Sequence, residues 1–238
     1  MNINWKAFYE KEAYFKRFIP EEQPVNVRGE FISELIPERV STVLDVGCGD
    51  GWLCNKLSNK YKVAGVDIAL PRVLYAKSHF NSEAFLVSNI YNLPFADNSY
   101  DAVICSETLE HIEDFSSAVK ELMRVSKKYV VATVPNNQPK RTILCPHCLH
   151  TFYLDGHINS FDKKSFSEVF GKFGEVIKVK DSTQMGLFNP NKKHHIEFPD
   201  FVSQNLHIWN FLLSLGSRFF PITVRNGDFL GIVCAKNV

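Results

Sequence analysis

Five short apolar runs alternate with helix-like segments between residues 42 and 135. The runs are each four to six residues long and lie at 42–46, 62–67, 84–88, 102–105 and 129–134. Segments with apolar side chains three or four positions apart lie at about 51–60, 71–80 and 115–125. The runs predict buried strands, and the segments between them predict amphipathic helices. This alternation indicates an α/β fold whose parallel sheet is covered on both faces.

The alternation stops after residue 135 and resumes later in the chain. Residues 136–160 are polar and contain cysteines and histidines, and we expect an insertion in loop form. A helix at 164–173 and strands at 175–180 and 229–235 continue the fold, and an irregular stretch covers 183–220. The sequence therefore predicts one domain, 1–238, made of an N-terminal segment 1–26, a core 27–135, the insertion 136–160 and a C-terminal half 161–238 that carries the insertion 183–220.

Aromatic and charged residues alternate at the start of the chain. Helical spacing extends to Pro20, and a second helix is expected over 28–38. One interpretation of residues 1–26 is an amphipathic helix packed on the domain. The other is a lid over a bound ligand, because aromatic side chains cover a ring system with little loss of entropy.

A glycine-rich turn joins the first predicted strand to its helix. Gly47, Gly49 and Gly51 follow the strand directly, so backbone N–H groups and a helix N-terminus converge on a ligand's polar end. The second strand ends in Asp67, twenty residues after Gly47. At that separation a βαβ unit places a carboxylate against a ribose diol. The pair predicts a cofactor that contains a nucleoside.

The residue after the turn narrows the choice of cofactor. Trp52 occupies the position where a dinucleotide-binding fingerprint has its third glycine, which argues against NAD and FAD. No Gly-Lys-Ser/Thr follows, which excludes a P-loop. A ligand with a ribose but no phosphate fits better, and S-adenosylmethionine is the common case.

Composition and charge add exclusions. The chain has 238 residues, 45% hydrophobic and 22% charged, with a formal charge of +1. Such a charge gives no general attraction to nucleic acid, so no nucleic-acid partner is expected. Six scattered cysteines indicate reduced, intracellular usage. We see no signal-peptide profile and expect no transmembrane segment, and therefore expect a cytoplasmic protein.

Three motifs resemble those of a known enzyme family. Residues 43–51 (VLDVGCGDG), 89–101 (NIYNLPFADNSYD) and 106–112 (SETLEHI) are similar in order and spacing to class I S-adenosylmethionine-dependent methyltransferases, and most similar to the type 11 group. The resemblance covers about residues 40–135 and weakens beyond them. It implies a Rossmann-like fold, with a seven-stranded, mostly parallel sheet, a reversed last strand and a cap built from the insertions. It also implies methyl transfer from S-adenosylmethionine.

The resemblance assigns a first group of residues to the methionine end of this cofactor. Asp45, Gly47 and Gly49 would shape that part of the pocket, with Asp45 reaching the ammonium through water. The backbone carbonyl of Ser106 would face the same ammonium.

A second group would hold the adenosine. Asp67 would bond the ribose hydroxyls, Ile68 would pack on the adenine, and the N–H of Ile90 would face the ring. Asn89 stands where the family usually has Asp. Its side-chain oxygen can accept the same hydrogen bond from the adenine amino group, though without the negative charge. The alternative for Asn89 is a plain turn residue.

Three polar side chains follow the fourth predicted strand, where open α/β sheets place ligands. These are Glu107, Glu110 and His111. His111 is the candidate catalytic residue, as a general base. A structural role is the alternative, because alignment of the acceptor with the sulfonium methyl can supply most of the rate.

The insertion contains the most unusual local feature. Cys145 and Cys148 form a C-x-x-C pair, and His150 and His157 would complete a Cys₂His₂ zinc site. The alternative is a metal-free loop that covers the substrate. Metal analysis before and after the double change Cys145→Ser with Cys148→Ser separates the two.

The acceptor is expected to be a small or lipid-like molecule under the cap. Residues 205–221 are apolar but interrupted, which indicates a core or lid helix, with a membrane-surface contact as the alternative. Methylation of RNA or protein remains a second hypothesis, and a non-catalytic scaffold that binds S-adenosylmethionine is a third. The sequence does not define the oligomeric state.

Overall fold

The computed structural model describes residues 4–15, 23–80, 84–144, 146–147, 149–153, 156–181 and 229–237. The chain divides into two units, one of residues 1–182 with 229–238 and one of residues 183–228. All of the following concerns the first unit. The predictions for 183–220, for 205–221 and for Cys145 and Cys148 lie outside the described residues.

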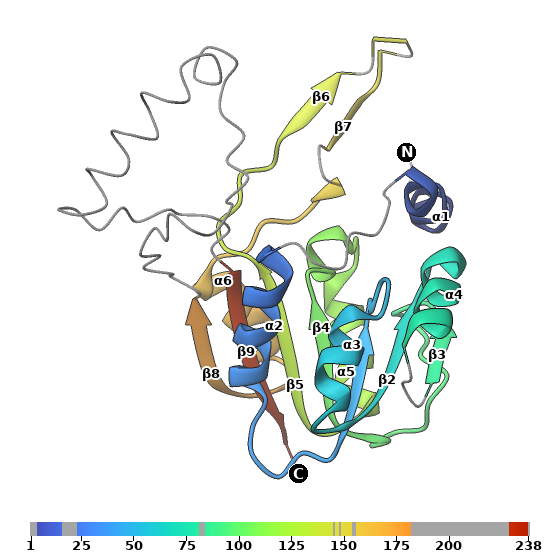
Figure 1. The fold of residues 1–238 in the computed structure, drawn as a ribbon. Coiled ribbons are helices and arrows are strands. Elements are labelled where there is room, and N and C mark those ends of the chain that lie inside the picture. The colour runs from blue at the N-terminus through green and yellow to red at the C-terminus, as the bar shows by residue number, and fades with distance from the viewer. Residues whose placement is uncertain are drawn as a thin grey trace, which may run out of the picture. The chain divides into compact units, whose positions relative to one another are not determined.

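A seven-stranded sheet forms the centre of this unit (Figure 1). Its strands are β1 (Thr42–Val46), β2 (Lys62–Asp67), β3 (Ala84–Val87), β4 (Tyr100–Ser106), β5 (Ser126–Pro135), β8 (Gly174–Asp181) and β9 (Phe229–Lys236). They lie in the order β3-β2-β1-β4-β5-β9-β8. The first five strands in this order, β3, β2, β1, β4 and β5, pair in parallel with their neighbours. Strand β9 is antiparallel to both β5 and β8. The predicted mostly parallel sheet with a reversed last strand is confirmed.

Helices cover both faces of the sheet. The helical elements are α1 (Trp5–Phe15), α2 (Gln23–Leu35), α3 (Trp52–Ser58), α4 (Leu70–His79), the 3₁₀ turn η1 (Leu109–His111), α5 (Phe115–Val125) and α6 (Lys163–Phe170). Side chains of α2, α3 and α4 form one buried cluster with Val43, Val63 and Val131 of the sheet. Side chains of α5 and α6 form the other with Leu44 and Val130. Neighbouring strand residues thus point to opposite cores, which explains why the strands are apolar without interruption.

The order of the sheet fixes where a ligand can bind. Strand β1 has β2 on one side and β4 on the other, so the chain crosses to opposite halves of the sheet from here (Figure 1). In open α/β sheets the crevice for ligands lies outside the carboxyl ends of the strands at such a point. The glycine-rich turn after β1, Asp67 at the end of β2 and Ser106 at the end of β4 all lie at this edge.

One expectation about the insertion 136–160 is wrong. Instead of an irregular loop it contains a two-stranded antiparallel ribbon of β6 (Thr142–Leu144) and β7 (Thr151–Tyr153). Its residues are mostly β-branched, aromatic or aliphatic, types that favour paired strands. Ile143, Leu144 and Phe152 are nevertheless exposed.

Among the described helices, none is both long and apolar enough to pass through a membrane.

Candidate functional site

The glycine-rich turn after β1 has a backbone that only glycine adopts easily. Gly47, Gly49 and Gly51 have φ angles of +81°, +54° and +82°. A Cβ atom on Gly47 would come within 2.3 Å of the Thr108 hydroxyl oxygen. The N–H groups of Gly47 and Cys48 donate to the Val66 carbonyl at 2.8 and 2.9 Å, which binds the turn to β2. The turn is therefore fixed both by its backbone conformation and by the elements around it.

The carboxylate of Asp67 binds the glycine turn from the end of β2. Its Oδ2 accepts a hydrogen bond from the N–H of Gly49 at 2.8 Å, and its Oδ1 accepts one from the N–H of Ala69 at 2.8 Å. Burial raises the pKa of Asp67, and these two hydrogen bonds oppose the rise. Each carboxylate oxygen has a second lone pair, so the group can still accept bonds from a ligand's hydroxyls.

Two adjoining cavities, of about 640 and 260 Å³, open around the turn. The larger is within the range of small-molecule sites. All eight residues that the sequence assigned to a cofactor line these cavities. Asp67, Ile68, Asn89 and Ile90 line the larger cavity only, Asp45 and Ser106 line the smaller only, and Gly47 and Gly49 line both. The residues predicted for the adenosine thus line the larger cavity, and those predicted for the methionine end line the smaller one, with the two glycines shared by both.

Asn89 takes part in a turn as well as lining the larger cavity. Its side-chain oxygen accepts a hydrogen bond from the N–H of Tyr91 at 3.1 Å. This bond is the turn role that the sequence left open. One lone pair of the amide oxygen remains for a ligand.

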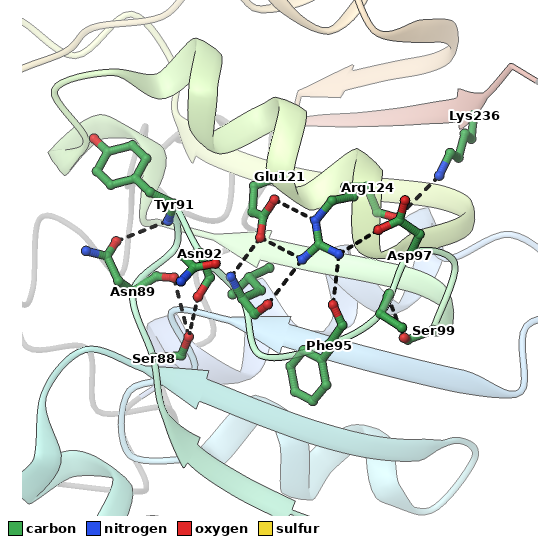
Figure 2. A network of polar contacts seen from close by, with 12 residues as sticks. Ser88, Asn89, Tyr91, Asn92, Phe95, Asp97, Ser99, Glu121, Arg124 and Lys236 are labelled. Atoms are coloured by element: carbon green, nitrogen blue, oxygen red, sulfur yellow. Dashed lines mark hydrogen bonds and ion pairs between the residues drawn. The ribbon is translucent and has the colours of Figure 1, made fainter.

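Arg124 of α5 holds the segment that carries Asn89. Its guanidinium donates to both carboxylate oxygens of Glu121 at 2.8 Å and to the carbonyl of Phe95 at 2.8 Å (Figure 2). It also donates to the Leu93 carbonyl at 3.1 Å and to Asp97 at 2.8 Å. Charge-assisted, bidentate hydrogen bonds of this kind are among the stronger ones in proteins. The motif 89–101 therefore owes its shape to an arginine outside it.

Carboxyl side chains line the smaller cavity. Asp45 is 2% exposed, and burial raises its pKa to about 7. Its Oδ2 accepts a hydrogen bond from the thiol of Cys54 at 3.5 Å. Burial also raises the pKa of Glu107 to about 7, while the positive charge of Arg28 lowers the pKa of both acids. Such a cavity, lined by carboxyl groups and by Arg28 and Arg72, suits a ligand that carries both positive and negative charge.

The Ser106 carbonyl, the other predicted contact of the methionine end, already accepts one hydrogen bond within the protein. The Ser106 carbonyl accepts a hydrogen bond from the Thr108 hydroxyl at 3.0 Å. The Ser106 hydroxyl lies 2.9 Å from that of Thr133, which also donates to Glu107 at 3.2 Å. These bonds orient the end of β4 toward the smaller cavity.

His111 lies in the wall of the larger cavity, as the sequence predicted for a catalytic candidate. Its Nδ1 is 3.1 Å from the Gly156 carbonyl, and its ring lies 4.7 Å from the ring of His157. Glu110, 1% exposed, lies behind it. Burial raises the pKa of Glu110 well above its ordinary value, and the charge of Glu107 adds to the rise.

Of the predicted zinc ligands, only two are described. His150 is exposed on the segment before β7, whereas His157 lines the larger cavity. The structure places His157 with Glu110 and His111, not with a described cysteine. The Cys₂His₂ site remains a prediction, since Cys145 and Cys148 lie outside the described residues.

Sequence reasoning missed two arginines, and it left open whether residues 1–26 lie over a ligand. Arg28 of α2 and Arg72 of α4 line both cavities. Asn4, Lys6 and Tyr9 also line the larger cavity, and the ring of Tyr9 lies 5.7 Å from that of His111. Arg72 has a local signal, since it falls in the first turn of the helix after Asp67. Arg28 has none, because its position depends on how α2 packs against the sheet.

Residues 44–132 match the family model described as a methyltransferase domain. An O-methyltransferase of Aspergillus nomiae is 32% identical over 44% of this chain and 52% of its own length. A 2-phytyl-1,4-naphtoquinone methyltransferase of a Nostoc species is 32% identical over 48% of this chain and 54% of its own length. This chain therefore spans about half the length of these curated relatives.

Solved structures extend the likeness of the fold to almost the whole chain. A putative methyltransferase of Haloferax volcanii, solved in complex with a methyltransferase activator, superposes with a TM-score of 0.62 over 98% of this chain and 95% of that one. The two are 17% identical, so this likeness concerns the fold alone. The fold is thus that of the class I, S-adenosylmethionine-dependent methyltransferases, and within it residues 44–132 match a methyltransferase domain.

Proposed function

We propose that the protein transfers a methyl group from S-adenosylmethionine to a small or lipid-like acceptor. The observation that carries the proposal is the bond between Asp67 and Gly49. It brings the carboxylate at the end of β2 and the glycine turn after β1 to one cavity wall. That juxtaposition provides a ribose-binding acid beside backbone donors, and it is built by two strands of the matched region.

The larger cavity is the proposed site for adenosine. Asp67 accepts bonds from the ribose hydroxyls, and Ile68 packs on one face of the adenine. The side-chain oxygen of Asn89 accepts a hydrogen bond from the adenine amino group through its remaining lone pair, and the Ile90 N–H faces the adenine ring. Supporting this assignment, all four residues line this cavity, and Ile90 is buried.

The smaller cavity is the proposed site for the methionine end. Asp45, the Ser106 carbonyl and Glu107 are acceptors for the ammonium group, and the turn of Gly47 and Gly49 supplies close backbone approach. Arg28 supplies the positive charge for the carboxylate. The acidic surroundings also favour the positively charged sulfonium over the neutral sulfur of the product.

The acceptor enters the larger cavity from the side of α1 and the insertion 136–160. Tyr9, His111 and His157 lie there. We therefore propose that residues 1–26 act as a lid and that the insertions determine the substrate specificity. A small or lipid-like acceptor is supported by the similarity to the 2-phytyl-1,4-naphtoquinone methyltransferase of a Nostoc species. We propose a cytoplasmic location because the four described cysteines are free thiols, the usual state of cysteines in that compartment.

Transfer of labelled methyl groups into cell-extract fractions tests this proposal. Lipid, small-molecule, RNA and protein pools are each incubated with the full chain and methyl-labelled S-adenosylmethionine. The Asp67→Ala variant gives the background, and Glu38→Gln, an exposed change of charge away from the cavities, is the matched control. We expect label in the lipid or small-molecule pool with the natural chain and the control only. Label confined to RNA or protein contradicts the proposed acceptor, and label in no pool contradicts the activity.

A further inference from the structure

Three ligand-type side chains meet in the wall of the larger cavity. One nitrogen each of His111 and His157 and one carboxylate oxygen of Glu110 lie within 4.8 Å of one another. His111 Nε2 and Glu110 Oε1 are 3.9 Å apart. The histidines line the cavity, whereas Glu110 is buried behind them. Glu110 and His111 belong to η1, whereas His157 follows β7, so the cluster is assembled from distant parts of the chain.

The carboxylate of Glu110 has an unusual environment. Its side chain is almost completely buried, and neither of its oxygens has a hydrogen-bond partner among the described residues. A buried carboxylate without partners is strongly unfavourable, and proteins keep such groups paired or bound to metal. The distance of 3.9 Å to His111 exceeds that of a hydrogen bond, so this contact does not satisfy the carboxylate.

Both imidazole rings are oriented by their Nδ1 atoms. His111 Nδ1 lies 3.1 Å from the Gly156 carbonyl, which can only accept, so this nitrogen carries the proton in the neutral ring. His157 Nδ1 lies 2.7 Å from the Gln138 side-chain oxygen and carries its proton for the same reason. Each neutral ring then has its lone pair on Nε2. Metal-binding histidines are held in this way by a second acceptor.

We propose that Glu110, His111 and His157 bind one divalent cation of the zinc class, zinc itself or a first-row transition metal. Two histidines and one glutamate with further positions open to solvent form a known donor set for such ions. Ligands of a tetrahedral ion lie about 3.3–3.6 Å apart, because each bond is about 2.0–2.2 Å long. Binding would therefore draw the three atoms together by up to about 1.5 Å, which requires rotation of their side chains.

The ion would face the proposed methyl donor across the cavity. Because the histidines line the cavity and Glu110 lies behind them, the open positions would face the cavity. We infer that they hold an acceptor hydroxyl, whose proton leaves to water more easily on the metal. The hydroxyl oxygen then forms a bond to the methyl carbon as the carbon–sulfur bond breaks. The electron pair of the broken carbon–sulfur bond stays on sulfur. This role of the metal rests on the proposed function; the binding of the metal does not.

Titration with Co²⁺, followed by visible absorption, tests the site on the full chain without any substrate. The variants are Glu110→Gln, which keeps the shape of the side chain, and His157→Ala, which changes the cavity wall. His79→Ala, on the exposed surface of α4, is the matched control. We expect one equivalent of Co²⁺ to bind to the natural chain and to the control, and both site variants to bind at least about tenfold more weakly. Circular dichroism establishes that each variant is folded.

The double variant Cys145→Ser with Cys148→Ser separates this site from the Cys₂His₂ set, with which it shares His157. Retained binding without sulfur-to-cobalt charge-transfer absorption supports the proposal. Loss of binding in this double variant overturns it, as does failure of the natural chain to bind Co²⁺ or unchanged binding in both site variants.

Azide, added to the cobalt-loaded protein, probes the open positions. A changed spectrum supports the acceptor role, and an unchanged one overturns that role. Titration with S-adenosylhomocysteine is measured separately, and we expect Glu110→Gln to leave it unchanged. If Co²⁺ binds as expected but S-adenosylhomocysteine does not, the metal site stands and the proposed function fails.

Discussion

Asp67 and Gly49 are joined by a hydrogen bond of 2.8 Å between the carboxylate at the end of β2 and the backbone N–H in the turn after β1. The acid that the sequence assigned to a ribose therefore also holds the turn in place. Removing the carboxylate affects the ligand contact and the shape of the turn together, whereas changing it to an amide preserves one acceptor oxygen.

Asp67→Asn and Asp67→Ala are expected to differ in how strongly they weaken binding of S-adenosylhomocysteine. Hydrogen bonds to charged groups contribute about 1.5–3 kcal/mol, so loss of the carboxylate in Asp67→Ala should weaken binding at least about tenfold. Asp67→Asn should lose less of this affinity, because its amide oxygen can still accept the hydrogen bond from the N–H of Gly49. Calorimetric titration measures both. Equal affinities of Asp67→Ala and the natural chain would rule out Asp67 as a ligand residue.

Gly47→Ala should destabilise the protein more than Gly49→Ala. Both glycines have positive φ angles, where an added Cβ costs roughly 1–2 kcal/mol. At Gly47 the Cβ would also lie 2.3 Å from Thr108 Oγ1, whereas at Gly49 the nearest atom is a guanidinium nitrogen of Arg72 at 3.5 Å. We expect an additional loss of about 1–3 kcal/mol for Gly47→Ala, measured by urea unfolding. The opposite order of stability would show that the turn is shaped differently.

Arg124→Gln should loosen the segment that carries Asn89. Arg124 bridges Glu121 to the carbonyls of Leu93 and Phe95, and a shorter amide cannot make all of these bonds (Figure 2). We expect the free energy of unfolding to fall by about 1–3 kcal/mol and binding of S-adenosylhomocysteine to weaken. Lys120→Gln, exposed on the same helix, is the control and should change neither. If both variants unfold alike, the network does not support the segment.

Asp45→Asn should change how stability depends on pH. The pKa of Asp45 in the folded protein, about 7, is raised by burial above its ordinary value of 3.8. The folded state therefore binds this proton more tightly, so the contribution of Asp45 to stability is full below about pH 4 and is lost as the pH rises to about 7.

Asparagine has no such proton to lose. The free energy of unfolding of the natural chain, relative to that of Asp45→Asn, should thus fall by on the order of a few kcal/mol between pH 4 and pH 7 and level off above. Urea unfolding at several pH values, without ligand, measures the difference. The raised pKa of Glu107 is common to both proteins and largely cancels. A difference that does not vary with pH would show that Asp45 ionises normally.

The predicted strands agree closely with the structure, because a buried parallel strand leaves a continuous apolar run in the sequence. The runs at 42–46 and 62–67 coincide with β1 and β2, and the helix predicted at 115–125 coincides with α5. The glycine turn and Asp67 were also recognisable, since a short loop and one strand relate them. Local order along the chain is sufficient for such features.

Contacts between distant segments could not be predicted in the same way. Arg28 reaches the cavities only because α2 packs across the sheet, and Glu110 meets His157 only because the segment after the ribbon returns to η1. The C-x-x-C spacing suggested one partner set for His157, while the fold places that histidine beside another. Spacing alone does not show which of two sets a histidine joins.

Calorimetric titration of the full chain with S-adenosylhomocysteine tests the central claim most directly, because it requires no knowledge of the acceptor. The account predicts that one equivalent binds, that Asp67→Ala binds at least about tenfold more weakly, and that Glu38→Gln binds like the natural chain. Absence of binding at millimolar concentrations of this ligand, with the protein shown to be folded, would contradict the account.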